Sequence, residues 1–423
     1  MNIQPRPDSL EAKPAAMPLA GELPIRAQFY QEDRLRLLGK QMAEGDTRSL
    51  EGLGAFDFQS RIRESAARIL EIYRSTNAAQ AKGEPITPAA QWLLDNNYLV
   101  EETIYQIKRD LPRRFYRQLP TLRLGDGTSV PRALAIAWAY VAHSDSSVSA
   151  QTFKAIVEGF QSVEPMKIGE IWALPSLLRF VLVENLRRLA LRVERARKMR
   201  LVANEVADRA LASADGGERE QMLSRYGAYA RDTTFATQLL YRLRDGSQNA
   251  GRALEWLEGE LEKSGSDAEQ IIMAEHQTLS AGNVTTGNII RGLRLINDVD
   301  WTVWFEEVSR IDEVLRQKAD YSALDFSSRD QYRTAIEELA RRSGRSEYSV
   351  AETAVDMAAR SVGRPDAGEE PSDVGFYLVG ACREVLEKEI GYRPPFGLSL
   401  KRSFRKAGWL GIFVPVFALT ALL

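Results

Sequence analysis

Apolar residues recur at steps of three and four along most of the chain, and this spacing limits its fold more than any other feature. Ile62, Ala66 and Ile69, for example, lie on one face of a 3.6-residue helix. No run of alternating β-branched residues reaches five or six positions, so strand signals are scarce. The sequence therefore predicts an all-α fold, a multi-helix array in which antiparallel helices are joined by short loops.

Residues that favour helix ends support this interpretation. Thr87, followed by a proline, predicts the start of a helix that continues to Pro112. The pairs Ser328–Gln331 and Ser349–Glu352 have capping-box spacing, and each precedes a run with helical period. The apolar stretch 172–183 is too short to cross a membrane and contains an arginine, so it predicts a buried core helix.

Composition shifts divide the chain only weakly. The first 24 residues hold five prolines in a polar context, without the apolar region of a signal peptide, and predict a disordered arm that stays in the cytoplasm. The stretch 363–371 is the best linker candidate, and a boundary at the turn-forming cluster near Asp215 would split the chain into two helical lobes. The predicted organisation is an arm at 1–24, lobe 1 at 25–214, lobe 2 at 215–400 and a basic, then apolar, segment at 401–423.

The C-terminal segment differs from the rest because residues 407–423 carry no charge. Seventeen helical residues cover roughly 25 Å, slightly less than the hydrocarbon core of a bilayer. A basic cluster precedes them, which is typical of the cytoplasmic end of a transmembrane helix. The sequence thus predicts the start of a transmembrane helix, with residues 1–400 on the cytoplasmic side. The candidate membrane-anchoring residues are Lys401, Arg402, Arg405, Lys406 and Trp409.

Signals for catalytic chemistry are weak. The 423 residues include 56 basic and 58 acidic side chains, so the formal net charge of −2 argues against a nucleic-acid partner. One cysteine and two histidines cannot form a closed structural zinc site without carboxylates. Asp298 and Asp300 form an Asp-x-Asp pair that could hold a divalent ion, but Asp300 directly precedes an amphipathic helix, which favours an N-cap. We predict no catalytic, cofactor-binding or metal-binding residue.

Three further groups of residues each allow a structural and a functional interpretation. His143 ends an apolar helix, where a cation gains from the helix dipole, and a role as general base has no visible partner. Glu158, Glu170 and Glu184 could supply paired carboxylates, although such helical residues are usually solvated or salt-bridged. The basic segment 108–114, interleaved with aromatic residues, could stack on sugars or nucleotides, but more often such residues cover a helix–helix joint.

Several long phrases resemble one family, the N-terminal cytoplasmic region of bacterial cyclic β-1,2-glucan synthases. They are PAAQWLLDNNYLVEETIYQIKRDLPRRFYRQLP (88–120), RALAIAWAYVAHSD (132–145), EPMKIGEIWALPSLLRFVLVENLRRLA (164–190), DFSSRDQYRTAIEELARRSGRSE (325–347), SDVGFYLVG (372–380) and IGYRP (390–394). The resemblance covers most of 88–423. It implies a large inner-membrane glycosyltransferase that builds and cyclises β-1,2-glucan from UDP-glucose with a divalent metal such as Mg²⁺.

The family's transferase motifs have no match here, so the resemblance transfers no catalytic residue. It implies a helical scaffold that ends inside the first transmembrane helix, is itself inactive, and contacts the remaining domains of the synthase and the bilayer. The alternative is a stand-alone membrane-anchored helical adaptor that binds another membrane protein. Continuation of the reading frame into further apolar spans would favour the synthase.

Overall fold

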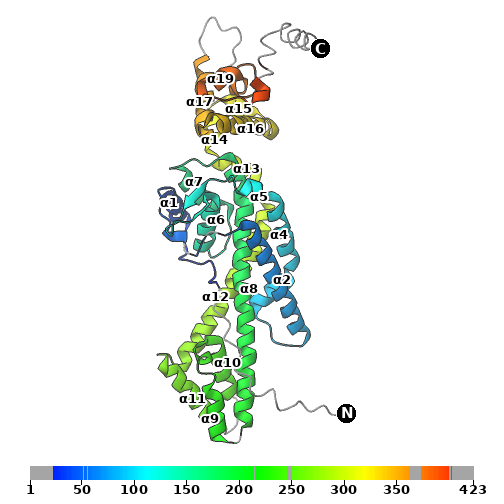
Figure 1. The fold of residues 1–423 in the computed structure, drawn as a ribbon, viewed down its shortest axis with the longest axis vertical. Coiled ribbons are helices and arrows are strands. Elements are labelled where there is room, and N and C mark those ends of the chain that lie inside the picture. Colours follow the sequence, from blue (N-terminus) through cyan, green and yellow to red (C-terminus); the bar gives the residue numbers. More distant parts are fainter. Residues whose placement is uncertain are drawn as a thin grey trace, which may run out of the picture. The chain divides into compact units, whose positions relative to one another are not determined.

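The computed structural model describes residues 22–50, 52–54, 56–213, 215–244, 250–361, 373–399 and 402, and these are mostly helical (Figure 1). The predicted helical class is confirmed, with one exception that the sequence did not signal. Strands β1 (Thr121–Arg123) and β2 (Ser129–Pro131) pair antiparallel, with Leu122 opposite Val130. Gly127 has φ +85° in the connecting turn, a conformation that glycine adopts without strain.

The chain folds as two compact units. Unit 1 comprises residues up to 156 together with 173–299, and unit 2 comprises 157–172 together with the residues from 300. The boundary predicted near Asp215 falls inside unit 1, where the Asp215 carboxylate accepts a hydrogen bond from Gly217 N–H at the start of a helix. The reason is that the helices after Asp215 pack back onto the helix before it.

The first part of unit 1 surrounds a fully buried helix, α6, of which every residue from Arg132 to His143 is buried. The helices here are α1 (Glu32–Ala43), η2 (Arg48–Leu50), α2 (Phe58–Ala81), α3 (Pro88–Asp95), α4 (Asn97–Asp110), α5 (Arg113–Tyr116), α6 (Arg132–His143), the start of α7 (Ala150–Gln161) and most of α8 (Ile168–Ala212). Residues 173–183 of α8 are buried except Arg179, so the predicted core helix is confirmed.

The second part of unit 1 is a smaller bundle around the C-terminal half of α8. It contains α9 (Gly216–Ser224), η3 (Tyr229–Arg231), α10 (Thr233–Arg244), α11 (Ala250–Lys263) and α12 (Ala268–Asp298). Its core includes Val206, Phe235, Leu239 and Leu257, all fully buried. Figure 1 shows α10 and α11 beside the lower half of α8, and α12 also packs on α3. Long helices α8 and α12 therefore connect the two parts of unit 1.

Unit 2 is a compact group of short helices. It contains α13 (Trp301–Val308), α14 (Arg310–Leu315), α15 (Ala319–Ala323), α16 (Phe326–Ser343), α17 (Glu347–Ser361), α18 (Val374–Leu378) and α19 (Arg383–Ile390). Helix α17 packs on α14, α16 and α18, and its Val350, Ala354 and Ala358 are fully buried. The end of α7 and the first turn of α8 complete the unit.

Several predicted helix ends need correction. Thr87 caps α3 as predicted, accepting from Ala90 N–H at 3.3 Å, but the expected helix to Pro112 is divided at Asn96. The buried Asn96 amide donates to Trp92 O, and its oxygen accepts from Arg294, a residue 198 positions away. The caps of α16 and α17 are Asp325 and Ser346, each three residues before the predicted serine, because these side chains already accept the first free N–H groups.

In the part of the chain that the structure describes, no helix has both the length and the apolar character needed to cross a bilayer. The predicted transmembrane segment 407–423 lies outside the described residues, and so do Lys401, Arg405, Lys406 and Trp409. Their membrane-anchoring role stays a prediction.

Candidate functional site

The Asp-x-Asp pair is divided between a helix end and a helix start. Asp298 is the last residue of α12 and is exposed. Asp300 caps α13 and accepts from the N–H groups of Thr302 at 3.0 Å and Val303 at 3.3 Å. The hydrogen bond from the Thr302 hydroxyl, together with these N–H donors, lowers the pKa of Asp300. The capping prediction is confirmed. Among the described residues, no group of three or more His, Cys, Asp or Glu could hold a metal ion.

His143 has a structural environment. The ring is buried, stacks on Tyr30 with a centroid distance of 4.2 Å, and its Nδ1 lies 2.7 Å from Gln28 O. Because a carbonyl can only accept, Nδ1 carries the proton in this contact. Burial lowers the pKa of His143, against a smaller opposing effect of the Gln28 carbonyl. His143 is therefore a neutral side chain that holds the N-terminal segment, contrary to the expected cation at a helix end.

That N-terminal segment, residues 22–30, is here called the strap. It is extended, and Ala27 N–H and Tyr30 N–H donate to the carbonyls of Ala142 and His143 at the end of α6, both at 2.8 Å. The Asn185 side chain of α8 binds the backbone of the buried Ile25 through two hydrogen bonds. Its Oδ1 accepts from Ile25 N–H at 2.7 Å, and its Nδ2 donates to Ile25 O at 3.2 Å. The predicted arm 1–24 thus overlaps the strap at residues 22–24, and residues 1–21 lie outside the described part.

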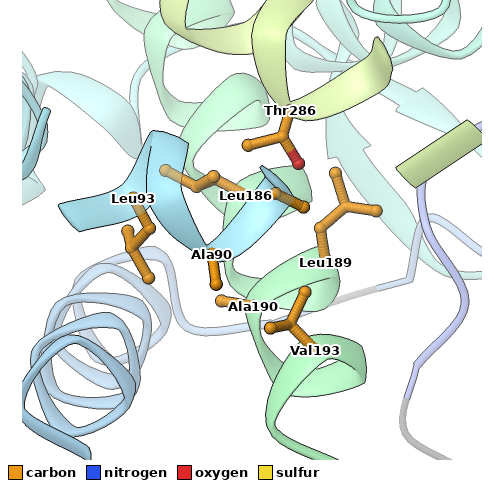
Figure 2. Close-up of a pocket in the computed structure, with 8 residues that line it drawn as sticks. Ala90, Leu93, Leu186, Leu189, Ala190, Val193 and Thr286 are labelled. Atoms are coloured by element: carbon orange, nitrogen blue, oxygen red, sulfur yellow. The ribbon is translucent and has the colours of Figure 1, made fainter. Parts of the chain in front are cut away.

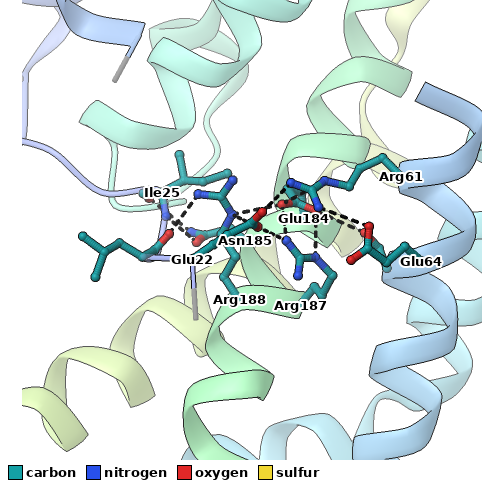
Figure 3. Close-up of polar contacts among 10 residues, drawn as sticks. Glu22, Ile25, Arg61, Glu64, Glu184, Asn185, Arg187 and Arg188 are labelled. Carbon is teal, nitrogen blue, oxygen red and sulfur yellow. Dashed lines mark hydrogen bonds and ion pairs between the residues drawn. The ribbon is translucent and has the colours of Figure 1, made fainter. Parts of the chain in front are cut away.

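A buried cluster of charges lies beside the strap (Figure 3). Glu184, 1 % exposed, pairs with Arg187 at 2.7 Å, Arg188 at 2.9 Å and Arg61 at 3.6 Å. Positions three and four residues after Glu184 share its helix face, which is why α8 supplies two of the three arginines. Glu22 of the strap also pairs with Arg61, at 2.7 Å, and with Arg187. Glu184, one of the three candidate carboxylates, is therefore salt-bridged.

Neighbouring charges hold Glu22 and Arg187 of this cluster in their charged forms. Burial by itself raises the pKa of Glu22, but hydrogen bonds and charge from Arg61 and Arg187 outweigh it and lower the pKa to about 2. For Arg187, burial is likewise outweighed by Glu184 and Glu22, so its pKa is raised. Groups that stay ionised at neutral pH cannot exchange protons with a substrate there. Glu22 and Arg187 can therefore bind the strap to α8, but they do not form an acid–base pair.

A turn after α6 connects the strap to α8 and α12. Asp145 and Ser146 have φ of +50° and +61°, which non-glycine residues seldom adopt. Asp145 Oδ1 accepts from the Thr285 hydroxyl of α12 at 2.8 Å and pairs with Arg26 of the strap at 3.3 Å. Ser146 Oγ accepts from Asn185 at 2.8 Å. Sequence reasoning missed this turn, since only its polar run Ser-Asp-Ser-Ser could have indicated it.

Two hollows among the described residues of unit 1 do not suggest a ligand site. One has a volume of about 10 Å³, room for roughly one water molecule. It is lined by apolar side chains and Thr286, as Figure 2 shows, and the Thr286 hydroxyl already bonds Gly282 O. A second, wide hollow of about 420 Å³ is open to solvent and lined by one face of α12, including Met273 and His276. The first is a small packing gap, and the second is a shallow surface.

Unit 2 contains its own buried charge network. Asp312 is fully buried and accepts from the Tyr321 hydroxyl and from Arg333 Nη2, both at 2.6 Å. Arg333, 1 % exposed, also pairs with Glu306 at 2.7 Å. Its guanidinium lies over the ring of Phe305 at 5.0 Å and near that of Phe326 at 5.1 Å. The sequence did not single out these residues, because RIDEVL and DQYRTA read as ordinary solvated helices.

Glu347 is a further carboxyl group with an altered pKa. It begins α17 and accepts from Ile168 N–H at 2.7 Å. Burial raises its pKa to about 7, with a smaller opposing effect of the Ile168 N–H and a further increase from Glu337. The folded chain therefore binds more protons than the unfolded chain between the ordinary glutamate pKa and about 7, so this group's contribution to stability falls as the pH rises.

Replacing Glu347 by Gln is expected to raise the thermal midpoint of the chain at about pH 8, where the wild type holds an ionised half-buried carboxylate, and to change it little at about pH 4. Thermal unfolding followed by near-ultraviolet circular dichroism at both pH values checks this. Glu313→Gln, at a position 60 % exposed, is the control and should change the midpoint only slightly at either value, because exposed ion pairs contribute little to stability. A Glu347→Gln variant that loses stability only at the higher pH would contradict the assignment.

The basic segment 108–114 lies at a helix joint. Arg109 pairs with the adjacent Asp110 at 2.8 Å, and Arg113 lies 3.9 Å from Asp57. Tyr116 stacks on Phe58 of α2 with a centroid distance of 4.1 Å. These contacts favour the packing interpretation over a stacking site for sugars or nucleotides.

One of the predicted membrane-anchoring residues is described, and it binds protein groups. Arg402 donates to Glu387 Oε1 at 2.9 Å and pairs with Glu384 Oε1 at 3.5 Å, both on α19. The Arg402 side chain is therefore bound to unit 2.

No family model matches the chain. The chain is similar to the cyclic beta-(1,2)-glucan synthase NdvB of Rhizobium meliloti (strain 1021), with 50 % identity over 416 residues. The match covers 98 % of this chain and 15 % of that protein. The resemblance to cyclic β-1,2-glucan synthases is thus confirmed, as a similarity to one section of a much longer protein.

Proposed function

We propose that this chain is a helical, non-catalytic section of a cyclic β-1,2-glucan synthase, and that it supports the parts of the enzyme that transfer glucose. The observation that carries the proposal is the match over nearly the whole chain to a small share of a synthase. Identity of 50 % over 416 residues is far more specific than any short motif in the sequence.

The contacts of the acidic side chains support a non-catalytic role. Asp300 caps α13, Glu184 pairs with three arginines, and Asp312 binds Arg333 and Tyr321. A transferase needs carboxylates that are free to bind a metal or accept a proton. In this proposal, UDP-glucose and a divalent metal such as Mg²⁺ bind to other domains of the whole synthase, which are also the partners of these helices.

The same proposal places the chain at the inner membrane, with the helical units in the cytoplasm. Residues 407–423 enter the bilayer as the start of a transmembrane helix, because an uncharged apolar segment gains by leaving water. The basic residues before it stay on the cytoplasmic side, since each would cost roughly 2.5–3.5 kcal/mol at the bilayer centre.

The test is to incubate residues 1–423 with labelled UDP-glucose and Mg²⁺ or Mn²⁺. We expect no transfer of glucose. Asp300→Ala should instead lower the stability of the chain by about 0.5–2 kcal/mol, because it removes the cap of α13. Asp298→Ala is the matched control: it removes the other aspartate of the pair but no cap, and should leave stability nearly unchanged. Glucose transfer that either substitution abolishes would contradict the proposal.

A further inference from the structure

Large exposed apolar side chains are concentrated near the end of unit 2. Phe376, Val379, Val385 and Phe396 are 37 %, 47 %, 53 % and 84 % exposed. Single exposed apolar residues are common on any protein. Four of them within 21 residues form a local concentration, and such concentrations often mark a surface that contacts another molecule or a membrane. We call these four residues, with the exposed Lys388 and Arg393, the α19 face.

The backbone brings three of the four apolar residues together. Cys382 N–H donates to Phe376 O at 3.1 Å, and Val385 N–H donates to Cys382 O at 3.0 Å, so the end of α18 folds back on the start of α19. Gly380 permits this close turn, since a Cβ there would lie 2.8 Å from Phe376 Cα. Lys388 lies one helical turn after Val385 and shares its side of α19.

Arg402 limits how far this face can be from the apolar segment. Its guanidinium is held by Glu384 and Glu387 of α19. The uncharged sequence begins at residue 407, five residues later, and five extended residues span at most about 18 Å. Wherever residue 407 enters a membrane, α19 must therefore lie close to that membrane's surface.

The charges around α19 suit an anionic surface. Glu387 is paired with Arg383 at 3.2 Å as well as with Arg402, and Glu384 is paired with Arg402. Arg383 also pairs with Glu338 at 2.7 Å, so each of these three acids has a cationic partner. Lys388 and Arg393 are exposed cations, and Glu389 is the exposed acid near them. Cations close to an anionic leaflet are attracted to it, while apolar side chains can enter the boundary between headgroups and acyl chains.

We propose that the α19 face rests on the lipid bilayer, so that unit 2 touches the membrane surface through Phe376, Val379, Val385 and Phe396. This inference rests on the proposed entry of residues 407–423 into the membrane. It adds a second, peripheral membrane contact made by the folded unit itself.

The test uses the full chain with its single cysteine removed by Cys382→Ser. One new cysteine is introduced as Val385→Cys, as Leu410→Cys in the apolar segment, or as Ser327→Cys for the control, and carries a polarity-sensitive fluorophore. Ser327 is exposed at the start of α16, whereas Arg342 near its end accepts from Arg393 N–H. Fifteen helical residues separate the two by roughly 22 Å, so the control position lies far from Arg393 at the C-terminal end of the α19 face.

Each labelled chain is reconstituted into vesicles of phosphatidylcholine and phosphatidylglycerol that carry quenchers at the headgroup or deep in the acyl region. We expect headgroup quenchers to reduce the fluorescence at position 385 but not at 327, and deep quenchers to reduce it at 410. Quenching at 410 without quenching at 385 would overturn this inference and leave the membrane entry intact. Absence of quenching at both positions would contradict the membrane entry, and the inference with it.

The apolar segment of the chain itself is another possible occupant of the α19 face. In that case the fluorophore at position 385 would already report an apolar environment in detergent-free solution, before vesicles are added. That result would also overturn the inference.

Discussion

Asp312→Asn is expected to lower the free energy of unfolding of unit 2 by roughly 3–5 kcal/mol, because it leaves a buried arginine without its closest counter-charge. Asp312 and Arg333 are 0 % and 1 % exposed, and Arg333 Nη2 lies 2.6 Å from Asp312 Oδ1. Urea unfolding followed by tryptophan fluorescence measures the effect, since Trp172 stacks on Phe305, the ring that the Arg333 guanidinium covers.

Two further variants test whether the loss of stability in Asp312→Asn comes from the buried unpaired charge or from substitution in this region in general. Glu313→Gln, one residue further along α14, removes an exposed pair with Arg310 and should cost at most about 1 kcal/mol. The double substitution Asp312→Leu with Arg333→Met removes both charges, and should cost less than Asp312→Asn alone. Equal losses for Asp312→Asn and Glu313→Gln would contradict the proposed role of the network.

Glu184→Gln is expected to have an effect of similar size in unit 1, about 3 kcal/mol or more, because Arg187 and Arg188 lose the carboxylate between them while remaining almost completely buried. Glu22 of the strap is then the acid left beside Arg187 and Arg188, while Arg61 keeps its pairs with Glu22 and Glu64. The uncompensated repulsion between the guanidinium groups of Arg187 and Arg188 should open the cluster to which the strap is bound. We therefore expect the strap to detach more often from α8, and trypsin to cleave after Arg26 faster than in the wild type.

The matched control for Glu184→Gln is Glu64→Gln. Glu64 pairs with Arg61 of the same cluster at 3.2 Å, but it is 51 % exposed, so its loss should cost at most about 1 kcal/mol and leave tryptic cleavage unchanged. If Glu184→Gln destabilises the chain but the strap stays resistant to trypsin, the cluster stabilises α8 without holding the strap.

Local sequence determined the helical class and several helix ends. The three- and four-residue apolar steps predicted the helices correctly. The apolar face of an amphipathic helix is stable only when it packs against a core, so the spacing of its residues reveals the helix. Thr87 and Asp300 were correctly predicted as caps, because a cap is formed by a side chain and N–H groups two or three residues away.

Tertiary structure alone decided the division of the helix at Asn96, the strained turn at Asp145 and the two buried charge networks. Asn96 binds Arg294, and Glu184 binds Arg61, across separations that no local pattern records. Asp312 and Glu184 look like ordinary surface acids in the sequence, since a helix with a charged residue gives the same period whether that charge faces water or a buried arginine. A buried charge is stable only when its partner arrives from another element, so the packing of the helices determines where these side chains can lie.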